Sequence, residues 1–135
     1  MYDRTALIEL IRLKALKLGH FVLASGKVAY EAVARRDEQD APVAVVRMEQ
    51  LYPWPAERLD AVLARYPQAG ELVWLQEEPE NMGSWNFAKG RLYEAHEDDY
   101  QILRVSRPES ASPATGSHAV HEQEQDELLT RAVTV

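Results

Sequence analysis

Short, continuous apolar runs constrain the fold of this chain more than any other sequence feature. Three of them cover residues 21–24, 43–46 and 72–75, and a weaker fourth run covers residues 102–105. Runs without polar alternation are typical of strands that are covered on both faces, as in parallel sheets. Segments with helical spacing separate them, so right-handed crossovers are expected. The sequence therefore predicts an α/β fold with three α/β/α layers around a mainly parallel sheet of about four to five strands.

Apolar residues recur at helical spacing before, between and after these runs. The first such segment, residues 3–18, combines a wide leucine-rich arc with charged residues. That arc must be buried against a sheet face, another chain or a missing neighbour. If the strand order is two, one, three, four, the order reverses beside the first strand, where ligands of such sheets gather. The predicted helices cover residues 3–18, 28–38, 56–65, 85–96 and 118–132.

The composition excludes several classes of protein. At 135 residues with 46% apolar residues, the chain is long enough for one domain with its own core. A net charge of −7 argues against a nucleic-acid partner, since phosphate binding needs a basic surface. The chain contains no cysteine, which excludes a disulfide framework and a thiolate metal site. Its apolar runs are far shorter than the roughly 20 residues of a membrane span, so we expect no membrane association and a cytoplasmic location.

A polar stretch at residues 76–85 lies at the crossover from the third predicted strand to the next helix. Glu77 and Glu78 are adjacent there, and because consecutive side chains point apart, a shared-proton dyad is disfavoured. The following Pro79 is expected to end the hydrogen-bonded ladder of the strand. The stretch is either a solvated acidic turn or part of a site at the reversal point, which Lys27 flanks from the other side. These opposite charges indicate either a site or a simple salt bridge.

Other polar residues give weaker evidence for a metal, catalytic or phosphate-binding site. His118 and His121 share a helical face, as in a two-histidine metal site, but nothing in the sequence supplies further ligands. Ser110 and Ser112 have no general base close in sequence, although a base can approach in space. The Ser-Gly-Lys turn at residues 25–27 lacks the upstream glycine of a phosphate-binding loop. We therefore predict no metal site and no catalytic residue.

A series of motifs runs through the chain in a characteristic order. They occupy residues 23–28, 46–53, 73–79, 107–108 and 110–116, together with Asn81, Gly83, Trp85 and His121. Jointly they resemble the C-terminal domain of the E1 component of 2-oxoglutarate dehydrogenase, a domain of the transketolase C-terminal type. The resemblance covers about residues 21–132. It leaves residues 1–19 as an N-terminal amphipathic helix outside the match and makes residues 20–135 the E1-like α/β domain.

This resemblance implies membership in an oxidoreductase of the tricarboxylic acid cycle. Such an enzyme depends on thiamine diphosphate and Mg²⁺, decarboxylates 2-oxoglutarate and passes the succinyl group to a lipoyl carrier. Its preceding domains build the cofactor pocket, so no cofactor is expected in this domain. The expected partners are the catalytic domains of the E1 chain or a second E1-like chain, within a homo-oligomer. The resemblance implies interface and loop-anchoring roles for Gln76, Glu77, Glu78, Asn81, Trp85, Arg107, Ser110 and Ser112.

A regulatory role is the alternative. The resemblance extends to actinobacterial enzymes that bind acetyl-CoA, through a glutamine matched by Gln50 and through basic residues after the Pro-x-Pro turn. Only Arg58 keeps a positive charge there, whereas Glu57 would repel a phosphate. The alternative is therefore a small module that binds an acyl-CoA or another anionic metabolite at the carboxyl ends of the strands. Its contacts would come from Lys27, Gln50 and Arg58.

Overall fold

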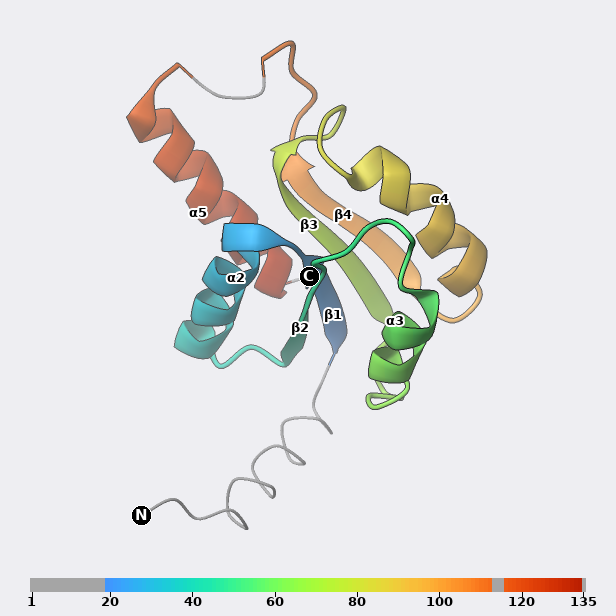
Figure 1. Ribbon diagram of the computed structural model, residues 1–135. Coiled ribbons are helices and arrows are strands. Elements are labelled where there is room, and N and C mark those ends of the chain that lie inside the picture. The colour runs from blue at the N-terminus through green and yellow to red at the C-terminus, as the bar shows by residue number, and fades with distance from the viewer. Residues whose placement is uncertain (1–18, 113–115, 135) are drawn as a thin grey trace.

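The structure is a computed structural model that describes residues 19–112 and 116–134 (Figure 1). The helix expected at residues 3–18 lies outside this part of the chain. Strands and helices alternate along the described residues, as the apolar pattern predicts. The strands are β1 (His20–Ala24), β2 (Val43–Arg47), β3 (Glu71–Pro79) and β4 (Gln101–Arg107), and the helices are α2 (Gly26–Gln39), α3 (Ala56–Leu63), α4 (Trp85–His96) and α5 (His118–Thr134).

The described strands form one parallel sheet with the order β2-β1-β3-β4. This arrangement confirms the predicted α/β class, and it has the strand order on which the expected reversal point depends. β1 lies in the middle of the sheet, and its residues Phe21, Val22 and Leu23 are fully buried. Helices α2 and α5 cover one face of the sheet, while α3 and α4 cover the other (Figure 1). Burial on both faces is the reason why the strand sequences are continuously apolar.

Alternate residues of the central strands contribute to two separate cores. On the side of α3 and α4, Phe21 of β1 and Trp74 of β3 pack with Leu92 of α4. On the side of α2 and α5, Val22 and Val73 belong to the second core. Each face of the sheet thus holds its own pair of helices by apolar burial. Further members of the second core are Val28, Ala29, Ala32, Leu128, Leu129, Ala132 and Val133.

β3 is longer than the sequence predicts. We expected it to end before the acidic stretch, but it continues to Pro79, which lies opposite Arg107 of β4 after a register shift that begins at Leu75. On the β1 side the pairing stops where Leu23 meets Trp74, so the proline interrupts no ladder there. The expected ladder end was therefore wrong, and part of the polar stretch belongs to the sheet.

Candidate functional site

The polar stretch that follows the core of β3 is organised by the side chain of Gln76. This amide is 5% exposed and lies at the carboxyl edge of the sheet, where the strands end. Its Oε1 accepts hydrogen bonds from Trp74 Nε1 (3.1 Å) and from the backbone N–H of Trp85 (3.0 Å). Its Nε2 donates to the carbonyl oxygens of Pro79 and Met82, both at 2.9 Å. One side chain therefore fixes the whole loop between β3 and α4.

Gly83 allows this loop to close tightly around Gln76. Its φ is +67°, and a Cβ atom placed there would lie 3.0 Å from Glu78 Cβ and 3.2 Å from Gln76 Oε1. Only glycine adopts this conformation without strain, and only glycine leaves room for both neighbours. Trp85, which follows the loop and is 5% exposed, packs into the core on the α4 side of the sheet. Trp85 is thus a buried anchor, as a loop-anchoring role requires.

Asn81 joins this loop to the segment that follows β4. Its Nδ2 donates to the carbonyl of Ser110 at 2.9 Å, and its Oδ1 accepts from the backbone N–H of Ser110 at 3.0 Å. This reciprocal pair reproduces one rung of a backbone ladder. The Ser110 hydroxyl in turn accepts from the backbone N–H of Ser112 at 3.1 Å. The two segments therefore form one connected surface, which we call the rim (residues 80–84 and 108–112).

Arg107 ties the rim to the sheet and to α5. It is 9% exposed, and its Nε donates to the carbonyl of Glu77 at 2.7 Å. Its Nη1 lies 3.5 Å from Glu124 Oε2, a buried oxygen that makes an ion pair there without a hydrogen bond of its own. Because the guanidinium reaches β3 and α5 at once, it couples the strand end to the last helix.

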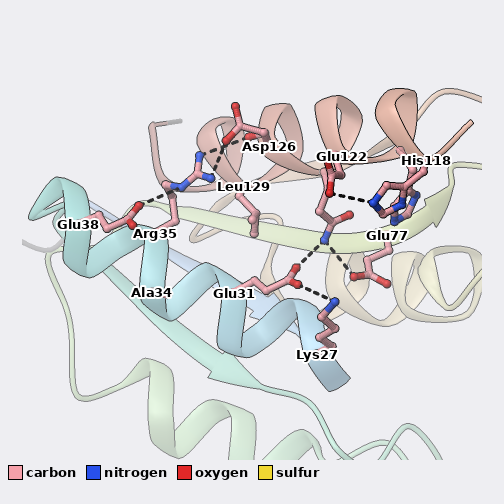
Figure 2. Close-up of a pocket in the computed structure, with 12 residues that line it drawn as sticks. Lys27, Glu31, Ala34, Arg35, Glu38, Glu77, His118, Glu122, Asp126 and Leu129 are labelled. Atoms are coloured by element: carbon pink, nitrogen blue, oxygen red, sulfur yellow. Dashed lines mark hydrogen bonds and ion pairs between the residues drawn. The ribbon is translucent and has the colours of Figure 1, made fainter.

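A pocket of about 430 Å³ opens beside the rim, between α2 and α5 (Figure 2). Gln125 of α5 reaches across it, and its Nε2 donates to Glu31 Oε2 (2.6 Å) and to Glu77 Oε1 (2.9 Å). Lys27 lies 3.2 Å from Glu31, not against Glu77. The structure therefore brings the predicted opposite charges to one pocket but links them through Glu31 and Gln125.

The charge of this pocket is mainly negative. Its lining contains the carboxylates of Glu31, Glu38, Glu77, Glu122 and Asp126 against only two strong bases, Lys27 and Arg35. Arg35 is itself engaged, with Nη2 at 2.6 Å from Asp126 Oδ1 (Figure 2). Such a lining disfavours an anionic ligand.

The other residues proposed for an acyl-CoA lie elsewhere. Gln50 is exposed in the loop after β2, where its Nε2 donates to the carbonyl of Pro53 at 2.9 Å. Arg58 is exposed on α3, on the opposite face of the sheet from the pocket. Neither residue lines the pocket that contains Lys27. The described pocket therefore unites only one of the three predicted contacts.

The chain can now be compared with known proteins. Residues 8–133 match the family described as 2-oxoglutarate dehydrogenase C-terminal. The chain belongs to this family. Similar proteins include the 2-oxoglutarate dehydrogenase E1 component of Cupriavidus necator, which is 43% identical over 121 residues, and that of a Geobacillus species, which is 38% identical over 120 residues. The oxoglutarate dehydrogenase of Buchnera aphidicola is 34% identical over 133 residues.

These alignments cover most of this chain and little of each relative. They span 89% of the chain for Cupriavidus, 87% for Geobacillus and 98% for Buchnera, but only 13%, 13% and 14% of the respective relatives. The family match begins at residue 8, within the segment of residues 1–19 that we placed outside it. The chain therefore corresponds to the C-terminal domain of 2-oxoglutarate dehydrogenase E1 homologues, and this domain is a small part of each relative's much longer chain.

Among the remaining candidates of this E1 C-terminal domain, His118 has a structural partner. His118 lies 3.0 Å from Glu122 on the exposed first turns of α5, and among the described residues no group of three His, Cys, Asp or Glu side chains is placed to hold a metal. In the same residues, no helix has the length and apolar character to span a membrane.

Burial raises the pKa of the Tyr100 hydroxyl, and the carboxylates of Asp99 and Asp60 raise it further. Tyr100 precedes β4 and so lies at the opposite edge of the sheet.

Proposed function

We propose that this chain is a non-catalytic assembly domain of a thiamine-diphosphate-dependent 2-oxoglutarate dehydrogenase E1. In this proposal, oxidative decarboxylation of 2-oxoglutarate and succinyl transfer to a lipoyl carrier take place in other domains, and the rim contacts those domains or a second E1-like chain in a homo-oligomer. The observation that carries the proposal is how the motif residues are used. Gln76, Asn81 and Arg107 each make hydrogen bonds to main-chain groups of this same domain.

Main-chain anchoring of this kind suits an interface better than a reaction centre. A catalytic group must present its polar atoms to a substrate, whereas both ends of the Gln76 amide are engaged by neighbours within the loop. A loop that is fixed before association loses less conformational entropy when a partner binds. The outer side of the rim stays accessible, since Asn81 and Ser110 are both exposed. The rim therefore has the properties of a preformed contact surface.

The cofactors would lie outside this domain. Thiamine diphosphate with Mg²⁺ needs oxygen ligands that converge on the metal, and the described residues offer no such cluster. The pocket between α2 and α5 contains more carboxylates than strong bases, and among these carboxylates Glu31 bonds to Gln125 and Lys27 while Asp126 bonds to Arg35. These residues do not fit a diphosphate. No step of the reaction is therefore assigned to them.

Co-expression with a relative tests the proposal directly. The partner is the Cupriavidus necator E1 component without the 121 residues that align with this chain. We expect the two chains to co-elute on size-exclusion chromatography with light scattering, and we expect 2-oxoglutarate-dependent CO₂ release to rise when both are present. Asn81→Ala should weaken co-elution, whereas Gln123→Ala on the exposed surface of α5 should not. Separate elution of the unmodified chains would overturn the proposal.

Ligand titration separates this proposal from the regulatory alternative. We expect acetyl-CoA, CoA and thiamine diphosphate at millimolar concentration to leave the melting temperature of the chain unchanged, because ligand binding would raise it. A shift with acetyl-CoA that disappears in Lys27→Ala and Arg58→Ala would support an acyl-CoA site instead. The negative lining of the pocket beside Lys27 argues for the first result.

A further inference from the structure

The outward face of α4 contains a glycine that the domain itself does not need. The helix turns Trp85, Ala88, Leu92 and His96 toward the core. Gly90 lies on the opposite side of the helix and is exposed, and a Cβ atom placed there would meet nothing within 4 Å. Glycine in a helix interior is less stable than alanine. No close neighbour among the described residues compensates for this loss.

Aromatic and cationic side chains surround Gly90 on this face. The ring of Phe87 lies 6.4 Å from that of Trp54, at an interplanar angle of 57°. The guanidinium of Arg91 stacks 3.7 Å from the centre of the Phe87 ring, and its Nη1 donates to the Phe87 carbonyl at 2.9 Å. Tyr93 is 37% exposed one turn after Gly90. Aromatic residues and arginine are the residue types that dominate the binding energy of protein interfaces.

We propose that the α4 outer face (Asn86, Phe87, Gly90, Arg91, Tyr93 and Glu94) packs against the main chain of the catalytic part of an E1 polypeptide, with Gly90 as the point of closest approach. This inference rests on the proposed function and names a second surface for it. The family relatives supply the occupant, because the matched domain makes up only 13% of the Cupriavidus chain and the rest of that chain belongs to the same polypeptide. The α4 outer face also continues directly from the rim, since the helix begins at Trp85, where the rim loop ends.

Close approach of a partner explains both the exposed glycine and the aromatic side chains beside it. A glycine lets a partner backbone come nearer than any side chain would, and the flanking rings then bury apolar area on either side of it. A methyl group at this position would hold the partner away. The same methyl group would improve the helix when no partner is bound. The substitution should therefore weaken binding of the partner and at the same time stabilise the free chain, and this combination distinguishes close approach from a general loss of stability.

The test compares Gly90→Ala with Gly70→Ala in the 135-residue chain. Gly70 is an exposed glycine before β3, and a Cβ atom there also meets nothing within 4 Å, so it is a matched control. The partner is the truncated Cupriavidus E1 component described above, purified separately and titrated with each variant by calorimetry. We expect Gly90→Ala to raise the melting temperature of the free chain by about 4 °C. We expect it to weaken binding to the partner by at least about tenfold.

The outcomes separate the two proposals. Retained binding by Gly70→Ala with weakened binding by Gly90→Ala supports the α4 outer face as the docking surface. Equal binding by the unmodified chain and both variants overturns this inference and leaves the proposed function standing. No binding by the unmodified chain overturns the proposed function together with this inference. A dimer of the chain alone that Gly90→Ala disrupts, without effect on the truncated E1, would assign the face to a second copy and also overturn the inference.

Discussion

Replacing Gln76 tests whether one amide organises the loop between β3 and α4. In the native chain this side chain satisfies two donors, the indole of Trp74 and the backbone N–H of Trp85, and three acceptors, the carbonyls of Glu78, Pro79 and Met82. Gln76→Ala removes all five hydrogen bonds and leaves the donors behind. Trp74 and Trp85 are 2% and 5% exposed, so water reaches these donors poorly.

The magnitude follows from the groups that lose their partners. A buried donor without a partner costs about 1–3 kcal/mol, and the two donors next to Gln76 are both on buried residues. Allowing for relaxation and for water at the carbonyls, Gln76→Ala should lower the free energy of unfolding by about 3–5 kcal/mol. That is a large part of the 5–15 kcal/mol that is typical of a whole domain. Gln76→Glu keeps the acceptors but loses the donors, and it places a carboxylate against carbonyl oxygens, so it should also destabilise the fold at pH 7.

Urea unfolding followed by far-ultraviolet circular dichroism measures this change without relying on tryptophan fluorescence near the mutated site. Gln123→Ala is the control, because the side chain of Gln123 is exposed and its amide donates to Glu127 of the same helix. The control should stay within about 0.5 kcal/mol of the native chain. If Gln76→Ala stays within about 1 kcal/mol as well, Gln76 does not organise the loop and the reasoning is refuted.

Three further substitutions test the loop, its link to α5 and the opposite edge of the sheet. Gly83→Ala should destabilise the chain by about 1–3 kcal/mol in urea unfolding, because the new Cβ would meet Glu78 at 3.0 Å with φ at +67°; unchanged stability would contradict the tight closure of the loop. Arg107→Lys should cost about 1–3 kcal/mol, since lysine cannot bond the Glu77 carbonyl and Glu124 in the same plane; a neutral result would show that charge alone suffices. The folded-state pKa of Tyr100 is raised, so its contribution to stability is present below the unfolded pKa of about 10 and is lost as pH rises above it. Tyr100→Phe should therefore flatten the fall in melting temperature between about pH 9.5 and 11, and an unchanged slope would count against burial of the hydroxyl.

The strands were predictable because burial on both faces leaves a simple signal, whereas their order could only be assumed. β1 and β2 are continuous apolar runs in the sequence, and the helix at Trp85–His96 has the bounds that its spacing predicts. The carboxyl half of β3 was not predictable. Its side chains are polar and it contains a proline, and only the register shift opposite Arg107 lets such a sequence stay in the sheet. That register depends on β4, which is distant in the sequence.

The contacts of the site residues also differ in whether the sequence could indicate them. The ion pair between Lys27 and Glu31 lies at helical i, i+4 spacing and could have been found in the sequence. The contacts of Gln125 with Glu31 and Glu77 could not have been found there, because they depend on how α5 lies against α2. Helical periodicity identifies the buried face of α5 but not its position along α2. The sequence therefore names most of the residues at the carboxyl edge without showing which of them meet.

The distribution of hydrogen bonds distinguishes the two surfaces at this edge. In the pocket, the charged groups bond to one another across helices: Gln125 joins Glu31 to Glu77, and Arg35 joins α2 to Asp126. A ligand would have to break these contacts before it made its own. On the rim, the anchoring side chains bond to main chain beneath them, so a partner can bind the exposed side without breaking any of those bonds. The free-energy cost of binding is therefore lower on the rim, which supports our proposal that a protein partner binds there and that no ligand occupies the pocket.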